Sequence, residues 1–235
     1  MKSFIEVTNL SKKYNEVVLD DCTFTVQQGE FVVLFGKNGS GKTTLLNIIA
    51  GIIPADKGTI AIGGTGLEKQ SIGYVFQNYQ DSLLPWRTNR DNISFVLDLH
   101  NLKKKEKEKK VSALLDQLNL QIPLNNYPYQ SSGGQQQMVA LLREIIYKPS
   151  VLLMDEPFSS LHHETRIFLQ EKLLEIWEKL DLTLIFVSHD IKEAIQLGQR
   201  ILILKKGKIT KEFSKKEFSN DKVLHDAIMH YLQRL

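Results

Sequence analysis

Residues suited to holding phosphate groups gather in one short segment of this 235-residue chain. Gly36-Lys37-Asn38-Gly39-Ser40-Gly41-Lys42-Thr43-Thr44 fits the phosphate-loop pattern G-x-x-x-x-G-K-[ST]. Its glycines let the backbone wrap a phosphate, the lysine brings positive charge to the β- and γ-phosphates, and the first threonine offers a hydroxyl to Mg²⁺. An apolar strand-like segment precedes the loop and a helix-like one follows it, so the sequence predicts a nucleotide site here.

Two carboxylates follow a second apolar segment. Val151–Met154 leads directly into Asp155, Glu156 and Pro157, and ligands of open α/β sheets bind at the carboxyl ends of the strands. Asp155 suits a Mg²⁺ shell, and Glu156 suits a base that orients water for attack on a γ-phosphate. A solvated Asp-Glu pair that merely ends a strand is the alternative, and the upstream phosphate loop disfavours it.

A third segment, Ser131-Ser132-Gly133-Gly134-Gln135, precedes a predicted helix. Adjacent glycines at a helix start expose backbone N–H groups to a phosphate, with the helix dipole behind them. The same residues also suit an ordinary Ser/Gly turn that caps a helix. Taken alone, this segment leaves both interpretations open.

Short apolar runs alternate with amphipathic ones along the chain, and this pattern predicts an α/β fold with a mostly parallel sheet. Two runs are almost wholly apolar, as in central parallel strands that are covered on both faces. The predicted strands are Phe4–Val7, Phe31–Phe35, Thr59–Ile62, Ile72–Phe76, Val151–Met154, Leu184–Val187 and Ile201–Leu204. The predicted helices are Lys42–Ala50, Asn89–His100, Lys103–Leu118 and Leu161–Leu180, with an amphipathic tail at Lys222–Leu232.

Composition excludes several classes of protein. No apolar run approaches the ~20 residues that cross a bilayer, and Met1-Lys2-Ser3-Phe4 does not resemble a signal peptide. A formal net charge of +3 is too small to indicate nucleic-acid binding. The single Cys22 excludes an internal disulfide and fits a reducing cytosol. The mixed-charge run at 103–110 indicates a solvated helix face.

The three segments together resemble the ATP-binding subunit of ABC transporters, and the resemblance covers nearly the whole chain. Tyr14 corresponds to the family's aromatic residue that stacks on adenine, Gln77 to the glutamine that contacts Mg²⁺ and the attacking water, and His189 to the switch histidine on the γ-phosphate. The resemblance implies that ATP and Mg²⁺ are the cofactors, with Thr43, Gln77 and Asp155 near the metal. It gives catalytic roles to Lys42, Gln77, Glu156 and His189.

The resemblance also implies the architecture and the partners. We expect one ABC ATP-binding domain over residues 1–235, with an N-terminal antiparallel β part and a helical subdomain at about 88–147. By the resemblance, two copies of this chain would pair head to tail, so that Ser132, Gly133, Gly134 and Gln135 of one copy complete the site of the other. Integral membrane permease subunits and an extracytoplasmic solute-binding protein would complete the assembly, with this chain peripheral on the cytoplasmic face and no role for nucleic acid.

The segment after Gln77 indicates a branch of the family. Leu83-Leu84-Pro85-Trp86-Arg87-Thr88 resembles importers of nitrate, sulfonates and taurine. An apolar run in a polar loop predicts an anchor for a partner, in a region that in this family borders the groove for the transmembrane subunit. Alternatively, Leu84 and Trp86 pin the loop to its own domain.

Three positions depart from the family pattern. In this family the segment that corresponds to Ser131–Gln135 is called the signature segment and usually opens with leucine. Ser131 replaces that leucine, which predicts that a local apolar anchor is missing. Met138 replaces an arginine, and His162 replaces an aspartate that helps to join the two sites across the dimer. We expect weaker coupling between the sites with ATP hydrolysis retained.

Other functions remain as alternatives. A soluble ABC-type ATPase working on DNA or ribosomes would carry coiled-coil insertions or tandem cassettes, which this chain lacks. An unrelated kinase or GTPase leaves the Ser-Gly-Gly-Gln segment and His189 unexplained. The departures leave open a catalytically weakened nucleotide-binding subunit.

Overall fold

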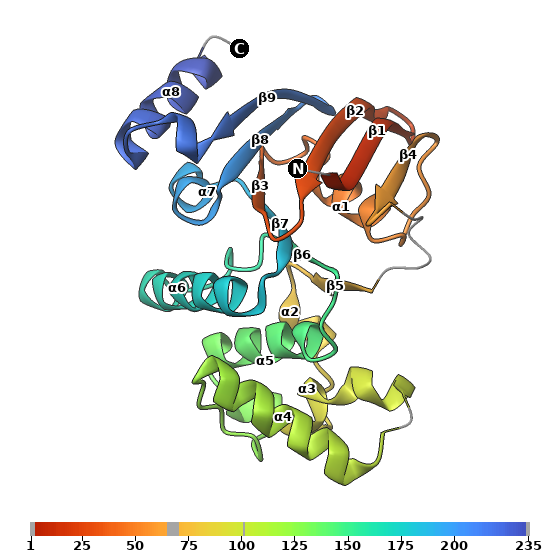
Figure 1. Ribbon diagram of the computed structural model, residues 1–235, viewed down its shortest axis with the longest axis vertical. Coiled ribbons are helices and arrows are strands. Elements are labelled where there is room, and N and C mark those ends of the chain that lie inside the picture. Colours follow the sequence, from red (N-terminus) through yellow and green to blue (C-terminus); the bar gives the residue numbers. More distant parts are fainter. Residues whose placement is uncertain (1–2, 65–70, 101, 234–235) are drawn as a thin grey trace. The chain divides into compact units, whose positions relative to one another are not determined.

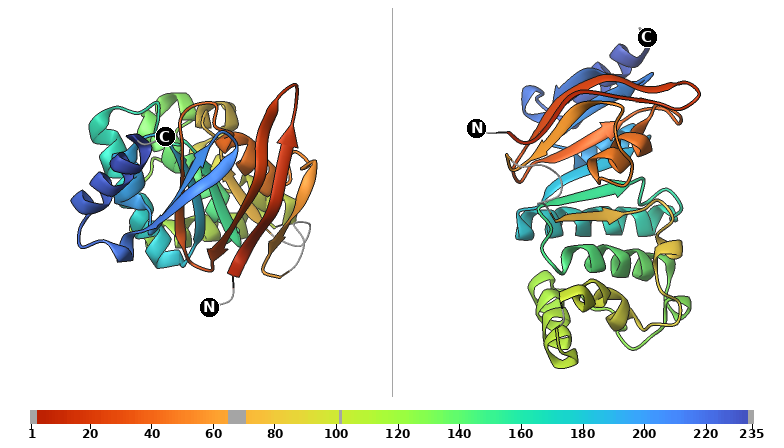
Figure 2. Two further views of the ribbon diagram at one scale, coloured as in Figure 1. Left: turned by 90° about the horizontal axis from the view of Figure 1, so that it is seen from above. Right: turned by 90° about the vertical axis from the view of Figure 1, so that its right-hand side faces the viewer.

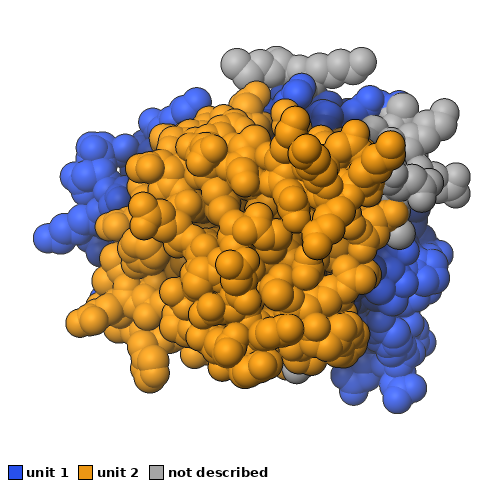
Figure 3. Space-filling view, turned by 90° about the horizontal axis from the view of Figure 1, so that it is seen from below, with its two compact units in different colours: residues 1–70, 182–235 blue, residues 71–181 orange. Residues whose placement is uncertain are grey.

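The computed structural model describes residues 3–64, 71–100 and 102–233, so Met1 and Lys2 of the segment compared with signal peptides lie outside it. The chain forms two compact units, Met1–Gln70 with Leu182–Leu235, and Ser71–Asp181 (Figure 3). Each unit is described by itself. Within the described residues, no helix combines the length and the apolar character needed to span a bilayer.

The first unit begins with an antiparallel sheet of order β2-β1-β4, formed by β1 (Ser3–Lys13), β2 (Val17–Gln27) and β4 (Lys57–Ile62). These strands run from red to orange in Figures 1 and 2. Cys22, Phe24 and Val26 alternate with exposed residues along β2, as a half-buried strand requires. This sheet is the predicted antiparallel β part, although the sequence analysis missed β2.

The same unit contains a second set of strands in the order β7-β3-β8-β9. Parallel pairing joins β3 (Phe31–Phe35) to β7 (Thr183–Ser188) and to β8 (Arg200–Lys205), whereas β9 (Lys208–Ser214) returns antiparallel to β8. Every residue of β3 and β7 is buried, which agrees with their apolar sequences. The helices here are α1 (Lys42–Ile49), α7 (Ile191–Leu197) and α8 (Asp221–Gln233), with a 3₁₀ turn η4 (Lys215–Glu217).

The second unit is mainly helical. It has two parallel strands, β5 (Ile72–Val75) and β6 (Val151–Asp155). Its helices are α2 (Tyr79–Ser82), α3 (Asn89–Ile93), α4 (Lys104–Leu118), α5 (Gly133–Ile145) and α6 (His163–Leu180), with 3₁₀ turns η2 (Phe95–His100) and η3 (Pro128–Gln130). Figure 1 shows α5 between α6 and α4, and it also packs on α2, α3 and β5.

The predicted α/β fold with parallel strands is confirmed, and several boundaries differ, among them the end of β1, which runs to Lys13 and not to Val7. The single helix expected over Asn89–His100 is in fact α3 followed by the 3₁₀ turn η2, with Ser94 as the C-cap of α3. The helix expected from Leu161 begins at His163, because Leu161 is part of a turn in which its N–H bonds to the carbonyl of Phe158. The helical subdomain expected at about 88–147 falls within the second unit and stays a prediction.

Candidate nucleotide site

The phosphate loop connects the end of β3 to the start of α1 within the first unit. A Cβ atom at Gly36 would lie 2.4 Å from the carbonyl oxygen of Leu204 and 2.6 Å from Ser40 Oγ. Gly41 has φ of +102° and precedes α1 as its N-cap, without a side-chain cap. Both positions therefore require glycine, one for close approach and one for a left-handed backbone.

The loop gathers hydrogen-bond donors at the start of α1. Lys42 is buried, and its Nζ donates to the carbonyl oxygens of Gly36, at 2.9 Å, and Lys37, at 3.2 Å. The Ser40 hydroxyl is buried and has no partner within the described part of the chain. A helix start that lacks a side-chain cap presents backbone N–H groups and a positive dipole end. These donors suit the oxygens of a phosphate, so the residues present fit a nucleotide's phosphate chain.

A cavity of about 620 Å³ adjoins the loop. Its lining includes Gly36–Ser40, His189, the end of β8 with the turn after it, and Leu232 of α8. The Gly36 N–H bonds to the carbonyl of Ser188 at 3.4 Å, which ties the loop to the end of β7, immediately before His189. Asp190 caps α7 through the N–H groups of Lys192 and Glu193. The structure thus brings His189 and the phosphate loop to one cavity.

A buried cysteine braces the same loop from behind. The Cys22 thiol donates to the carbonyl of Gly207 at 2.9 Å, and the Gly207 N–H in turn bonds to the carbonyl of Ser40 at 3.3 Å. Burial raises the pKa of Cys22 to about 11, so the thiol stays protonated and keeps this bond. Sequence reasoning treated Cys22 only as an indicator of redox compartment, and no local motif signals its contact with a turn 185 residues later.

Other predicted residues of the first unit lie apart from the cavity lining. Tyr14 follows β1, is 56% exposed, and has the Lys12 ammonium 5.5 Å from its ring centroid. Thr43 and Thr44 lie in the first turn of α1, where Thr43 is exposed. An exposed ring and an exposed hydroxyl are accessible to a ligand, and their roles stay predictions.

In the second unit, the residues predicted to contact Mg²⁺ and the attacking water lie at the carboxyl ends of the two paired strands. Parallel pairing sets Val75 opposite Met154, so Gln77 and the Asp155-Glu156 pair follow neighbouring strand ends. Asp155 is buried and Gln77 is exposed. Burial, and to a smaller extent the negative charge of Asp155, raises the pKa of Tyr74.

Glu156 has an unusual backbone. Its φ is +44°, a left-handed conformation that costs a residue with a Cβ roughly 1–2 kcal/mol. The carbonyl of Glu156 accepts bonds from the N–H and the hydroxyl of Ser159, at 3.2 and 3.0 Å, which close the turn that holds it. Strain of this kind often occurs where a side chain must be aimed at a ligand.

The signature segment forms the start of α5. Ser132 is the N-cap: its hydroxyl accepts from the Gln135 N–H at 3.3 Å, and the Gln135 side chain accepts from the Ser132 N–H at 3.0 Å. This is a reciprocal capping box. A Cβ at Gly133 would lie 3.1 Å from the Tyr79 hydroxyl, and one at Gly134 would lie 2.7 Å from Thr165 Cγ2. The glycines are therefore needed for packing as well, and their role toward phosphate stays a prediction.

Ser131 is held by a polar contact. It is buried, and its hydroxyl accepts a 2.9 Å bond from Asn89 Nδ2. The segment therefore has a polar anchor at the position where relatives carry an apolar leucine. Met138 is buried and lines a groove with Ser132, Gly134 and Thr165. His162 is the N-cap of α6 and makes no side-chain cap bond.

Asn89 and Tyr79 are contacts that the sequence analysis missed. The only signal for Asn89 is an amide among the polar residues that open a predicted helix, which does not reveal that it is fully buried. Tyr79 follows Gln77 by two residues, yet its packing on Gly133 appears only in the fold.

The sequence is similar to those of known proteins. The family described as "ABC transporter" matches residues 19–159. A probable sulfate/thiosulfate import ATP-binding protein, CysA of Chlorella vulgaris, is 39% identical over 222 residues, covering 92% of this chain and 93% of that protein. The spermidine/putrescine import ATP-binding protein PotA of Haemophilus influenzae is 37% identical over 94% of this chain, and the molybdate/tungstate protein WtpC of Pyrococcus horikoshii is 40% identical over 87%. This chain spans 60% of the length of each of the latter two.

Solved structures agree. The ATP-binding cassette MJ0796, described as a dimer in a post-hydrolysis state with ADP and Pi, superimposes with a TM-score of 0.78 at 29% identity, covering 91% of this chain and 100% of that one. CbiO1 of Clostridium perfringens shares the fold, with a TM-score of 0.85 at 24% identity over both whole chains. From the family match, the relatives and the fold together, this chain belongs to the ABC transporter family.

Proposed function

We propose that this chain binds and hydrolyses ATP and thereby supplies energy to the import of a small solute through separate membrane subunits. The observation that carries the proposal is the phosphate loop. There the buried Lys42 ammonium, the start of α1 and the Ser40 hydroxyl, which has no partner among the described residues, converge beside His189. Gly36–Thr44 would hold the phosphates, and Tyr14 would stack on the adenine.

By the family resemblance, Thr43, Gln77 and Asp155 would hold Mg²⁺, and their hydroxyl, amide and carboxylate oxygens are ligand types that it prefers. When bound, the ion neutralises charge on the β- and γ-phosphates. Glu156 would orient the attacking water and accept its proton, Lys42 would stabilise negative charge on the phosphates, and His189 would donate to a γ-phosphate oxygen.

The working unit in this proposal is a head-to-tail pair of copies. Ser132, Gly133, Gly134 and Gln135 of one copy would complete the phosphate site of the other. Support comes from the start of α5, where the helix dipole favours negative charge, and from the dimeric structure of the similar cassette MJ0796. Because ATP would bind both faces of such a pair, it would hold the copies together until hydrolysis.

The proposal also assigns partners and location. The similar proteins PotA, CysA and WtpC are named import ATP-binding proteins, which favours permease subunits, an extracytoplasmic solute-binding protein and a peripheral position on the cytoplasmic face. The solutes in their names are polyamines for PotA and oxyanions for CysA and WtpC, although the three proteins are nearly equally identical to this chain. Identity therefore does not select the solute, and the Leu83–Thr88 run remains the support for nitrate, sulfonate or taurine.

The decisive test replaces Glu156 with Gln. If Glu156 accepts the proton, phosphate release should fall by about 10²–10⁴-fold while ATP still binds. The variant should then accumulate as an ATP-bound dimer, measurable by light scattering. Glu178→Gln, at an exposed position near the end of α6, is the matched control and should hydrolyse ATP normally. An unchanged phosphate release in Glu156→Gln would favour the weakened, non-catalytic subunit.

A second experiment separates a transporter subunit from a soluble ATPase of the same family. The full chain, affinity-tagged in its native host, should co-purify with an integral membrane subunit after detergent extraction. Co-purification with ribosomes or DNA instead would overturn the transport proposal and leave the ATPase proposal intact.

A further inference from the structure

Two buried amides lie on the short helix α3. The side chains of Asn89 and Asn92 are both fully buried, although α3 is only five residues long. Burying an amide is costly unless its polar atoms find partners. The partners of the Asn92 side chain precede α3 in the sequence, whereas those of the Asn89 side chain follow it. The helix therefore connects two separate segments.

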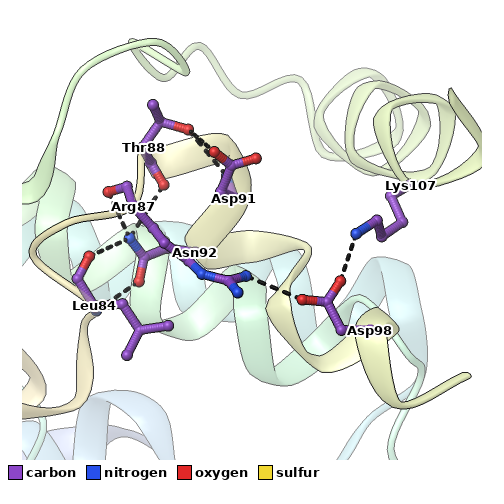
Figure 4. A network of polar contacts seen from close by, with 7 residues as sticks. All are labelled: Leu84, Arg87, Thr88, Asp91, Asn92, Asp98 and Lys107. Atoms are coloured by element: carbon purple, nitrogen blue, oxygen red, sulfur yellow. Dashed lines mark hydrogen bonds and ion pairs between the residues drawn. The ribbon is translucent and has the colours of Figure 1, made fainter. Parts of the chain in front are cut away.

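Asn92 closes the preceding loop onto α3, as Figure 4 shows. Its Oδ1 accepts from the Leu84 N–H at 2.8 Å, and its Nδ2 lies 3.0–3.1 Å from the carbonyl oxygens of Leu84, Arg87 and Thr88. The Thr88 hydroxyl also caps α3 by accepting from the Asp91 N–H. The loop at 84–88 and α3 are thus fixed to each other by several bonds.

The far end of this loop is braced as well. Arg87 pairs with Asp98 at 3.0 Å, Asp98 pairs with Lys107 of α4 at 2.5 Å, and the Arg87 guanidinium lies 4.8 Å from the ring centroid of Phe95. Between the braced residues, Trp86 is 71% exposed. The loop therefore presents one large aromatic side chain on an otherwise fixed backbone.

Asn89 makes the connection to the signature segment. Its Nδ2 donates to the carbonyl of Pro123 at 3.0 Å and to the Ser131 hydroxyl at 2.9 Å. Its backbone N–H bonds to the carbonyl of Asn126 at 2.7 Å. Ser131 immediately precedes Ser132, the N-cap of α5, so α3 contacts the segment that sets where α5 begins.

Stability alone does not explain the Asn89 amide. Asn89 Oδ1 is buried and, among the described residues, has no hydrogen-bond partner. An orphaned buried acceptor loses its hydration without gaining a hydrogen bond, whereas a matched apolar pair would avoid that cost. What the amide provides is a directed bond that fixes the orientation of Ser131.

From these contacts we propose that Asn89 is a positioning residue that couples the 84–88 loop to the signature segment. The helix α3 is bonded to the Trp86 loop through Asn92 and to Ser131 through Asn89, so the loop, the helix and Ser131 form a single hydrogen-bonded piece. A partner that docks on Trp86 would shift the start of α5, and occupation of the α5 start would shift the loop by the same linkage. This inference rests on the proposed function, since it assumes that α5 receives ATP in a dimer.

The test uses Trp86 as a reporter in the full chain. The parent carries Glu156→Gln, which should accumulate as the ATP-bound dimer, and Trp177→Phe, which leaves Trp86 as the single tryptophan because the sequence has two. In this parent, ATP should alter the quenching of Trp86 by acrylamide. Asn89→Ala and Ser131→Ala should each abolish that response and weaken ATP-driven dimerisation by about 5–10-fold, with no further loss when they are combined.

ATP binding to the monomer, measured by calorimetry at low protein concentration, should be unchanged in both variants, because the phosphate loop belongs to the other unit. Ser94→Ala removes another buried hydroxyl next to α3 and should keep the parent response. Should Asn89→Ala fold poorly, as judged by its melting temperature, Ser131→Ala carries the test. A full Trp86 response in Ser131→Ala, or none in the parent dimer, overturns the coupling. A parent that binds no ATP overturns the proposed function as well.

Discussion

The phosphate loop and the signature segment both present a helix start, and they are held in place differently. The loop at 36–42 is fixed mainly by its own backbone, with Lys42 folded back onto the carbonyls of Gly36 and Lys37. The atoms that crowd Gly36 and Gly41 most closely include backbone carbonyls. The signature segment is crowded instead by the side chains of Tyr79 and Thr165, and is anchored by Asn89.

This difference determines how well each site tolerates substitution and how freely it can move. A surround of backbone carbonyls cannot yield without moving strands, so the phosphate loop should be rigid and intolerant of substitution. A surround of side chains can adopt other rotamers, so the signature segment should tolerate compensated changes and be able to move. Each of the following predictions tests one side of this comparison.

The largest effect is expected from Gly36→Ala. Its Cβ would meet the Leu204 carbonyl at 2.4 Å, which should strain the loop by roughly 1–3 kcal/mol or more and lower ATP affinity by about 10–100-fold. Gly51→Ala is the control, since Gly51 lies outside the phosphate loop, a Cβ there meets nothing within 4 Å, and only its positive φ of 72° opposes the change. Calorimetry with ATP measures both, and equal losses would contradict a rigid surround.

Gly134→Ala probes the signature side. Its Cβ would lie 2.7 Å from Thr165 Cγ2, and such overpacking between α5 and α6 typically costs about 1–3 kcal/mol of unfolding free energy. Adding Thr165→Ser removes that methyl group, so the double variant should recover most of the loss in urea unfolding. If Thr165→Ser gives no rescue, the side-chain surround of this segment is not adaptable.

His162→Asp should have a smaller and opposite effect. His162 caps α6 without a side-chain bond, and aspartate is among the preferred N-cap residues, so the free energy of unfolding should rise by about 0.5–2 kcal/mol. The same change should strengthen coupling between the two sites and raise the cooperativity of ATP hydrolysis. An unchanged Hill coefficient and rate would argue against the expected coupling defect.

Asp98→Asn should have the smallest effect. Hydrogen bonding to Lys107, with Arg87 contributing, lowers the pKa of Asp98. A lowered folded-state pKa adds stability that is present above the unfolded value near 3.8 and is lost as pH falls through the folded value. The variant should therefore lose little at pH 7 and show a weaker acid-induced loss below about pH 4 in thermal melts. A large loss at pH 7 would mean that the ion pairs of Asp98 with Arg87 and Lys107 stabilise the fold more than exposed ion pairs usually do.

The same comparison explains which features were predictable from sequence. Some features are each a single continuous run of the sequence, so they could be predicted directly. These are the phosphate loop, the acidic strand end and the apolar strands β3, β6 and β7. The strand β2 was missed because its first half carries Asp20 and Asp21, and regular alternation begins only at Cys22.

The anchors of the signature segment were beyond reach for a related reason. The bond from Asn89 to Ser131 spans 42 residues, and the contact of Gly134 with Thr165 joins two helices. The prediction of one helix over 89–100 was wrong for a similar reason. Arg87 contacts both Phe95 and Asp98, and the periodicity of residues 89–100 carries no information about a residue that precedes them. Loss of the signature leucine could be seen in the sequence, but its polar replacement could not.

The left-handed backbone at Glu156 has a consequence for the evolution of this chain and for its engineering. Glycine or asparagine would relieve that conformation, so a search for thermostable variants that scores only folding should repeatedly select them at position 156. Each such gain would remove the carboxylate that the proposed reaction needs. Heat resistance and turnover would thus be opposing selections at this one residue, and a library screened for both should retain glutamate there.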